Sequence, residues 1–221
     1  MTFTIGIPVY NQAEFLMDAI DSALDQTVKC DIIVVNDGST DKSLEVARRY
    51  STVKVIDQVN KGLPSARNTI IMNSTSDFIL FLDADDELLE TCVEEMQKAI
   101  EETKADIVAP SFKTFGLTSQ EVIIMANPTL EDFKTSNRIG YFSAIRRSAL
   151  LEIGGYSPRM LWGYEDFHLW FNLLTRGKKL VTIPKVLVLY RIREKSMMQD
   201  ALAHHDELIN QIKKDFPYVY K

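Results

Sequence analysis

Three carboxylates follow a short apolar run near the middle of the chain. Residues 78–82 are all apolar, and the next four positions hold Asp83, Asp85 and Asp86. A short continuous apolar run is typical of a strand buried on both faces of a parallel sheet. Because such a strand cannot hold unpaired carboxylates, we expect the acids to emerge at its carboxyl end, the edge where open α/β sheets bind ligands.

The spacing of these acids favours a hard divalent cation. Asp83 and Asp85 alternate along the chain, so an extended backbone points them the same way. Neighbouring carboxylates repel one another unless a cation or hydrogen-bond donors lie among them. Oxygen ligands suit Mg²⁺ or Mn²⁺, completed by water and substrate phosphates. The alternative is that Asp85 or Asp86 caps a helix beginning at Glu87.

Two further segments carry polar groups suited to a nucleotide. In residues 36–41, Asp37 can accept hydrogen bonds from a ligand beside Ser39, although a strand–helix turn with an N-cap explains the same residues. In residues 60–68, Lys61 and Arg67 can bring positive charge to phosphates, and a guanidinium suits bidentate contact. The alternative for Arg67 is a solvated side chain or a salt bridge.

An aromatic pair precedes two more acids later in the chain. Trp162, Gly163 and Tyr164 are followed by Glu165 and Asp166. Aromatic faces suit sugar rings, and a carboxylate at this point can take a proton from a hydroxyl. The alternative is that the acids favour a helix N-terminus and the aromatics only pack.

The elements that must position these residues alternate between strands and helices. Apolar runs predict strands at 3–11, 31–35, 53–56 and 78–82, and helical apolar stripes fall at 14–24, 44–50 and 63–71. This order predicts a doubly wound parallel sheet with crossover helices. Further along we expect helices at 87–102, 148–153, 165–175 and 201–216, and strands at 105–110, 139–145, 179–183 and 186–190, the last two split by Pro184.

Composition excludes several classes of protein. The 221 residues are 46% hydrophobic, which suits one large α/β domain or a domain with an appendage. A net charge of −6 gives no basic footprint for nucleic acid. Cys30 and Cys92 are too few for a disulfide framework, so we expect buried free thiols and a cytoplasmic protein. We find neither a signal peptide nor an apolar run long enough to span a membrane.

The order of these motifs resembles that of family 2 glycosyltransferases. Residues 7–11, 36–41, 60–68, 82–86 and 165–166 match the family pattern, and the resemblance covers about residues 3–195. It implies a GT-A fold, a single Rossmann-like domain with a mainly parallel twisted sheet flanked by helices. On this basis residues 1–200 form the catalytic domain, with 1–105 binding the nucleotide-sugar and 106–200 the acceptor, and 201–221 form a C-terminal helical extension.

The resemblance also implies an activity. Family members transfer a sugar from a nucleotide donor, usually a UDP-sugar, to an acceptor hydroxyl with inversion, assisted by Mn²⁺ or Mg²⁺ at a D-x-D motif, often in polysaccharide biosynthesis. Carried over by position, Asp85 and Asp83 hold the metal, Asp166 is the general base, and Glu165 orients it or binds the acceptor. The acceptor side is Trp162, Gly163 and Tyr164. The implied donor-binding residues are Pro8, Tyr10, Asn11, Asp37, Ser39, Lys61, Arg67, Asp83, Ala84 and Arg193.

One position departs from the family pattern. Many relatives carry a metal-binding histidine where this chain has Arg193. An arginine cannot ligate a cation but can pair with a diphosphate. We therefore expect Arg193, with Arg191 and Lys195, to clamp the donor diphosphate, and metal dependence to be weakened.

Rival functions fit the pattern less well. A haloacid-dehalogenase-like phosphatase carries its D-x-D after the first strand, whereas Asp83 follows the fourth predicted strand. A dinucleotide oxidoreductase would need a G-x-G-x-x-G that the chain lacks. The remaining alternative is a catalytically silent member that binds a nucleotide-sugar or a partner. The sequence leaves open whether the acceptor is a saccharide or another hydroxyl compound. It also leaves open whether the last helix contacts a second copy or a partner, and whether the protein lies at the inner face of a membrane.

Overall fold

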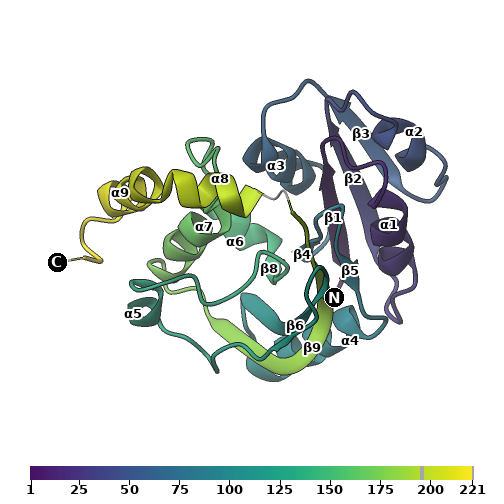
Figure 1. The fold of residues 1–221 in the computed structure, drawn as a ribbon. Coiled ribbons are helices and arrows are strands. Elements are labelled where there is room, and N and C mark those ends of the chain that lie inside the picture. The colour runs from purple at the N-terminus through teal and green to yellow at the C-terminus, as the bar shows by residue number, and fades with distance from the viewer. Residues whose placement is uncertain (195–196, 221) are drawn as a thin grey trace.

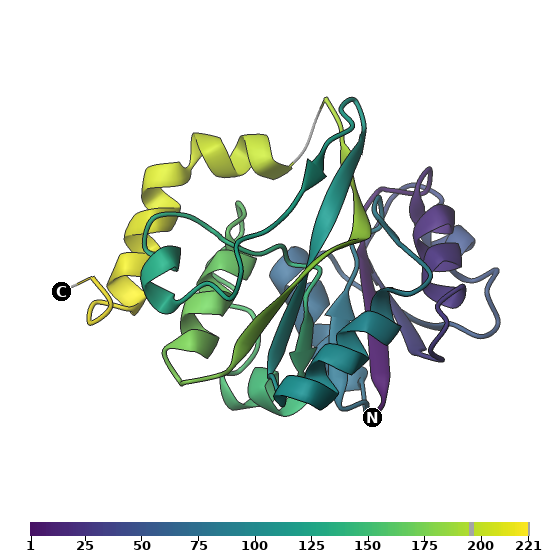
Figure 2. The same ribbon diagram turned by 90° about the horizontal axis from the view of Figure 1, so that it is seen from below.

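The chain folds around one mixed sheet that runs through the whole molecule. The computed structural model describes residues 1–194 and 197–220, with the backbone alone at Met198. The strand order is β3-β2-β1-β4-β8-β6-β9-β5, and β7 pairs with β6. Figure 1 shows the N-terminal strands on one side of the molecule and the C-terminal helices α8 and α9 on the other, and Figure 2 shows the same separation from below.

The N-terminal half confirms the predicted parallel sheet. Its strands are β1 (Phe3–Val9), β2 (Asp31–Asp37), β3 (Lys54–Gln58) and β4 (Phe78–Phe81), and all adjacent pairs among them are parallel. The connecting helices are α1 (Leu16–Leu24), α2 (Ser43–Ala47) and α3 (Leu63–Asn73). In Figure 1, α1 and α2 cover one face of these strands and α3 covers the other, as right-handed crossovers require.

The C-terminal half extends this sheet with antiparallel partners. β8 (Ala144–Arg146) pairs antiparallel with both β4 and β6 (Ile107–Gly116), and so joins the two halves. The remaining elements are β5 (Glu87–Leu88), α4 (Cys92–Thr103), β7 (Glu121–Val122), α5 (Leu130–Phe133), α6 (Arg147–Glu152), α7 (Glu165–Leu174), β9 (Leu180–Ile192), α8 (Met197–Ala203) and α9 (His205–Asp215).

The predicted break at Pro184 is wrong, because β9 runs through it. β6 and β9 pair in parallel from Ile107↔Leu180 to Gly116↔Ile192, with register shifts near Pro110 and Ser111. The pairing passes from Pro110↔Ile183 to Ser111↔Val186. Pro184, which has no N–H to donate, therefore lies within the irregularity and costs the ladder no hydrogen bond.

Two predicted helices also differ from the structure. The helix expected from residue 87 begins at Cys92, because Glu87 and Leu88 pair with β9 instead. This excludes the interpretation of Asp85 and Asp86 as helix caps. The helix expected at 201–216 is divided into α8 and α9 at His204, whose ring stacks on Trp162 with centroids 4.5 Å apart.

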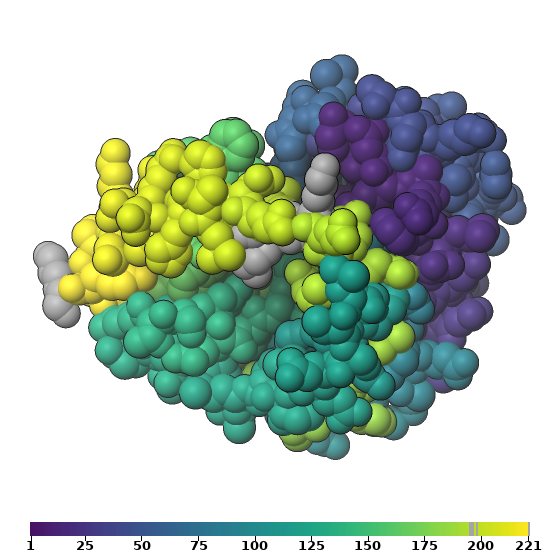
Figure 3. Space-filling model, in the orientation of Figure 1, coloured from purple at the N-terminus to yellow at the C-terminus, as the bar shows by residue number. Residues whose placement is uncertain are grey.

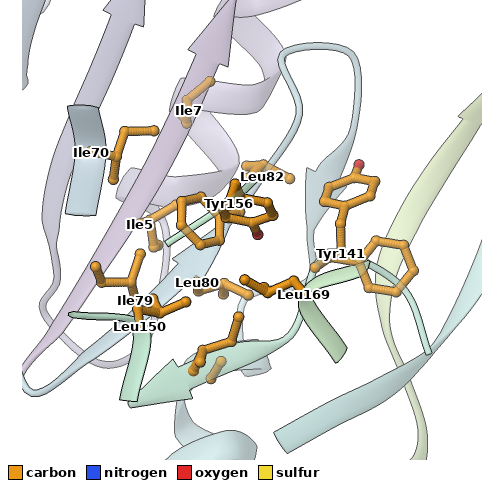
Figure 4. Packing of buried hydrophobic residues seen from close by; sticks show 14 of the residues in the cluster. Ile5, Ile7, Ile70, Ile79, Leu80, Leu82, Tyr141, Leu150, Tyr156 and Leu169 are labelled. Carbon is orange, nitrogen blue, oxygen red and sulfur yellow. The ribbon is translucent and has the colours of Figure 1, made fainter. Parts of the chain in front are cut away.

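The core lies on the central strands. β1 and β4 are buried along their whole length, α3 packs on β1, and side chains of α6 and α7 belong to the same core cluster. Figure 4 shows the side chains that meet there, among them Ile5, Ile7, Ile70, Ile79, Leu80, Leu150 and Leu169. Cys92 is buried and Cys30 half-buried, and both are free thiols. Among the described residues, none of the helices combines the length and apolar character of a membrane span.

Gly6 sets how closely α3 approaches β1. A Cβ added at Gly6 would lie 2.4 Å from Cγ2 of Ile70. We predict that Gly6→Ala lowers the free energy of unfolding by about 1–3 kcal/mol, because it overpacks this contact. Urea denaturation measures the loss. In the Ile70→Ala background, which removes the clashing atoms, the same substitution should cost less, and an equal cost in both backgrounds would contradict the contact.

Candidate functional site

A cavity of about 520 Å³ opens at the carboxyl ends of β1, β2 and β4. This is the sheet edge at which the sequence predicted ligand binding. β1 contributes Pro8 and Val9, β2 contributes Asp37, and the turn after β4 contributes Asp83, Ala84 and Asp85. The rest of the lining is Tyr10, Gln12, Asn60, Gly62, Leu63, Ala66, Leu161, Trp162, Tyr190, Arg191, Arg193 and Met197.

Asp37 fixes the loop that forms one wall of this cavity. Its Oδ1 accepts hydrogen bonds from Gln58 Nε2 at 2.7 Å and from the Lys61 backbone N–H at 3.0 Å, and its Oδ2 accepts one from the Gly62 N–H at 2.8 Å. Gly38 has φ +70°, and a Cβ there would lie 2.7 Å from the Asn60 backbone nitrogen. The carboxylate therefore orders the cavity wall, and only glycine fits beside it.

Asn11 and Ser39 hold two loops at the cavity rim together. The Asn11 N–H donates to Ser39 Oγ at 3.0 Å, and the Thr40 N–H donates to Asn11 Oδ1 at 2.7 Å. Neither residue lines the cavity, and the side chain of Lys61 also lies outside it. The residue before α2 is Lys42, whose side chain makes no capping hydrogen bond, and the Ser43 N–H at the helix start donates to Asp41 Oδ1 at 2.9 Å. Neither Ser39 nor Thr40 therefore caps this helix.

The three acids after β4 each have a protein partner. Asp83 Oδ1 lies 2.7 Å from Arg67 Nη2, and Asp85 Oδ2 lies 2.7 Å from Arg193 Nη2. Burial raises the pKa of Asp85, the neighbouring Asp83 charge adds to the rise, and the Arg193 guanidinium opposes it. Asp83 and Asp85 thus emerge toward the cavity, as predicted.

Asp86 does not emerge as predicted. Its side chain turns into the protein, where it accepts hydrogen bonds from the Tyr141 hydroxyl and, at 2.7 Å, from the Arg191 backbone N–H. Burial, and then the charges of Asp85 and Asp83, raise its pKa well above the ordinary value. Tyr141 gave no signal in the sequence, because its partner lies 55 residues away.

Arg67 is wholly buried between the acidic turn and α7. Besides its bond to Asp83, its Nη1 lies 2.6 Å from Glu165 Oε1. The guanidinium carbon lies 4.8 Å from the Tyr141 ring centroid and 5.3 Å from that of Tyr156. The salt-bridge alternative for Arg67 therefore holds, and both Nη atoms are engaged by carboxylates. Its predicted contact with a phosphate stays a prediction that this geometry does not favour.

Asp166 opens into a second cavity, of about 420 Å³. Its Oδ2 accepts a hydrogen bond from Asn137 Nδ2 at 2.9 Å, and its Oδ1 accepts one from the Phe167 N–H at 2.7 Å. Burial and the adjacent Glu165 charge raise its pKa to about 7, while Arg67 and the two hydrogen bonds oppose the rise. Asn137 is a site residue that the sequence did not reveal, because nothing near it in the chain indicates a partner 29 residues away.

The second cavity is mainly apolar. Figure 3 shows a hollow on this face, between the yellow C-terminal helices and the teal segments below them. Apart from Asp166, Asn137 and Arg138, the lining consists of Phe112, Val122, Ile124, Met125, Ile139, Gly140, Tyr141, Phe142 and Tyr190. Tyr190 lines both cavities, so the two are neighbours.

Of the aromatic pair before Asp166, Tyr164 lines neither cavity, whereas Trp162 lies on the first cavity. Trp162 is half exposed and lines that cavity with Leu161 and Met197. The Tyr164 hydroxyl lies 2.9 Å from His205 Nδ1, and a Cβ on Gly163 would lie 2.7 Å from Ala201 Cβ. These contacts anchor the C-terminal helices to the site, and an acceptor role for the three residues stays a prediction.

The acids do not form a ready-made metal site. Among residues 1–194 and 197–220, no three His, Cys, Asp or Glu side chains are grouped so that they could hold a metal ion. Asp83 and Asp85 are each ion-paired with an arginine. A cation on either carboxylate would have to compete with a guanidinium. Lys195, predicted to act with Arg193, lies outside the described residues.

Comparison with known proteins identifies a family for this arrangement. The family model described as "Glycosyl transferase family 2" matches residues 4–154. The chain is 30% identical over 217 residues to the Streptococcus pneumoniae glycosyltransferase GlyA, a match that covers 88% of this chain and 31% of that protein. It is also 30% identical over 195 residues to the poly(ribitol-phosphate) beta-glucosyltransferase of Bacillus spizizenii, covering 81% of this chain and 30% of that protein.

Solved structures share the fold. The crystal structure of Staphylococcus aureus TarS 1–349 in complex with UDP-GlcNAc superposes with a TM-score of 0.78 at 18% identity, covering 90% of this chain and 61% of that one. This likeness confirms the predicted GT-A fold. The chain spans about a third of the length of GlyA.

The buried Arg67 gives a testable prediction. Arg67→Ala leaves Asp83 and Glu165 as unpaired charges, so we expect the free energy of unfolding to fall by about 3–5 kcal/mol. Arg49→Ala is the control, because its pair with Glu45 is exposed and such pairs contribute little. Urea denaturation of both variants measures the difference. Equal stabilities would show that Arg67 does not bridge the two carboxylates in solution.

Proposed function

The chain belongs to glycosyl transferase family 2, and on that premise we propose that it transfers a sugar from a UDP-sugar to an acceptor hydroxyl with inversion. The observation that carries the proposal is the placement of Asp166. Its carboxylate opens into one cavity, while the acidic turn with Asp83 and Asp85 lines the neighbouring one. Arg67 connects the two through Asp83 and Glu165.

The first cavity is the proposed donor site. It has the nucleotide-facing residues that the family resemblance implies, Pro8, Tyr10 and Asp37, at the end nearest β1 and β2. The same cavity is lined by Arg191 and Arg193, whose positive charge can neutralise a diphosphate. S. aureus TarS has been crystallised with UDP-GlcNAc, and this supports a uridine diphosphate sugar as the donor class here.

Asp166 is the proposed general base. It accepts the proton of the acceptor hydroxyl as the hydroxyl oxygen bonds to the anomeric carbon, and the bond from that carbon to the diphosphate oxygen breaks. Attack from the side opposite the leaving group inverts the anomeric carbon. A pKa of about 7 suits this role, because the carboxylate is partly ionised near neutral pH and retains the proton once it has taken it. Glu165, held by Arg67, positions the start of α7.

The second cavity is the proposed acceptor site. Phe112, Phe142 and Tyr190 form an interlocked aromatic wall, with ring centroids 5.2–6.3 Å apart. Aromatic faces pack against the C–H faces of sugar rings. A saccharide whose accepting hydroxyl reaches Asp166 is therefore the acceptor class that we propose.

A specific observation favours the silent alternative. Asp83 and Asp85 are both paired within the protein, as they would be in a member that no longer handles a donor. A catalytically silent protein, whether it binds a nucleotide-sugar or a partner, would release no UDP from any UDP-sugar. Enzymatic UDP release that exceeds the rate without protein would therefore exclude it.

A thermal-shift panel tests the donor class. We predict that UDP raises the unfolding midpoint more than GDP, CDP, dTDP or ADP at equal concentration, because only a bound ligand stabilises the folded state. The panel is run with and without Mn²⁺. A larger response to another nucleoside diphosphate would overturn the assignment of uridine.

The base is tested by Asp166→Asn. We expect the substitution to reduce the rate of sugar transfer about 10²- to 10⁴-fold, because the amide cannot accept the proton, while UDP affinity is retained. At pH 8 the variant should be at least as stable as the wild type. The reason is that folding raises the pKa of Asp166 to about 7. The free energy of unfolding of the wild type therefore falls as pH rises from the unfolded pKa toward about 7, and the uncharged Asp166→Asn variant does not suffer this loss. Loss of UDP binding would indicate a structural role instead.

The pH profile gives a second test of the base. We predict that kcat/KM rises with pH through an apparent pKa near 7, which reports the free enzyme. Asn137→Ala removes a hydrogen bond that stabilises the ionised carboxylate of Asp166. The substitution therefore raises the apparent pKa and moves the rising part of the pH profile to higher pH. Asn73→Ala, remote from the site and exposed, is the control. If the rising part of the profile stays in place or moves to lower pH in Asn137→Ala, the role of Asn137 is contradicted.

A further inference from the structure

We propose that Arg193 is the cation of the donor site, bridging Asp85 and the donor diphosphate in the place where the family resemblance implies a divalent metal ion. The inference rests on the proposed function for the identity of the donor. It deepens that proposal, because it assigns the charge that stabilises the leaving group to a residue of this chain.

The contact with Asp85 is direct. Arg193 Nη2 lies 2.7 Å from Asp85 Oδ2, and the two side chains are 29% and 13% exposed. Both residues line the first cavity. A divalent cation would bind the same carboxylate oxygen at about 2.1 Å if it were Mg²⁺. A metal ion on this oxygen would lie close to the guanidinium, so the two positive charges compete for Asp85.

Arg193 is the basic side chain best placed to contact a ligand in the cavity. Among the described residues that line the cavity, the basic ones are Arg191 and Arg193. Arg191 is committed to the protein, since its Nε donates to the Asp85 carbonyl at 2.7 Å and its guanidinium lies 4.2 Å from the Phe115 ring centroid. Arg67 is wholly buried and engaged by two carboxylates.

The guanidinium of Arg193 has donors to spare. Within the described part of the chain, its one polar contact is the Nη2 bond to Asp85. An arginine presents five N–H donors in a planar fork that suits phosphate oxygens. The Phe15 ring, with its centroid 5.2 Å from the guanidinium carbon, lies against the group. Arg193 can therefore keep Asp85 and donate to a diphosphate at the same time, which is the bridging that a metal ion would perform.

Strand pairing holds the two residues in place. Arg193 directly follows β9, which stays in register with β6 to its last residues, Phe115↔Arg191 and Gly116↔Ile192. β9 also pairs with β5, where Glu87↔Leu189 lies just after the acidic turn. Asp85 and Arg193 thus each lie within two residues of a strand pairing that involves β9. The sheet therefore places the backbones of Asp85 and Arg193 close together, within reach of their side-chain ion pair.

Calorimetry of UDP binding tests the proposal. The wild type, Arg193→Ala and Arg193→Lys are each titrated in excess EDTA and in Mn²⁺. We expect the wild type to bind UDP in EDTA. Arg193→Ala should bind UDP about 10- to 100-fold more weakly, because it loses charge-assisted hydrogen bonds to the diphosphate. Arg193→Lys should retain part of the affinity, because it keeps the charge but not the fork. Arg49→Ala is the matched control for loss of one exposed positive charge.

Mn²⁺ binding without nucleotide gives a second readout that does not depend on activity. Electron paramagnetic resonance measures free Mn²⁺ in solutions of each protein. We expect Arg193→Ala to bind Mn²⁺ more tightly than the wild type, because Asp85 is released, and Arg193→Ala/Asp85→Asn to lose that gain. Equal Mn²⁺ binding by the wild type and Arg193→Ala would show that Arg193 does not compete with a metal ion for Asp85, and would overturn the proposal.

The outcomes separate this inference from the proposed function. A wild type that binds UDP only with Mn²⁺, or an Arg193→Ala variant that binds UDP as well as the wild type in EDTA, overturns the role of Arg193 and leaves the donor assignment intact. A wild type that binds no nucleotide under either condition overturns both. Circular dichroism of each variant confirms that a loss of binding is not a loss of fold.

Discussion

The buried guanidinium of Arg67 is the interaction on which the site depends. It lies between the turn after β4 and the start of α7 and pairs with one carboxylate from each, Asp83 at 2.7 Å and Glu165 at 2.6 Å. A buried charge is costly unless it is fully paired, so the position of Arg67 constrains both acids. Because Asp166 follows Glu165 directly, the same constraint sets where the proposed base lies relative to the proposed donor cavity.

Charge balance explains why three acids can crowd into one turn. Neighbouring carboxylates raise one another's pKa, and here each is given a different partner, with Asp83 on Arg67, Asp85 on Arg193 and Asp86 on Tyr141. Asp86 is the most buried of the three, and burial together with the neighbouring charges raises its pKa well above the ordinary value. The turn therefore presents two carboxylates to the cavity and uses the third to fix its own shape.

The long strand β9 connects the parts of the site. It runs over 13 residues to the cavity, pairing with β6 on both sides of the irregularity at Pro184 and with β5 near its end. The residues that reach the site from it, Tyr190, Arg191 and Arg193, lie at its carboxyl end. Figure 2 shows this strand crossing the molecule alongside β6. A helix or loop in its place would not hold a cation beside the acidic turn with the same precision.

The sequence by itself determined the parallel half of the sheet, the family resemblance and the positions of the acids. Continuous apolar runs and strand-end carboxylates are local patterns, and local patterns are what a sequence displays. The tertiary structure alone decided the partners. Arg67 meets Glu165 across 98 residues, Asp166 meets Asn137 across 29, and Asp86 turns inward to Tyr141 across 55. The same holds for Arg193, which the sequence assigned to a diphosphate and which the sheet places on Asp85. Such pairings depend on which segments of the chain become neighbours in the fold, and the spacing of residues along the chain does not indicate which segments these are.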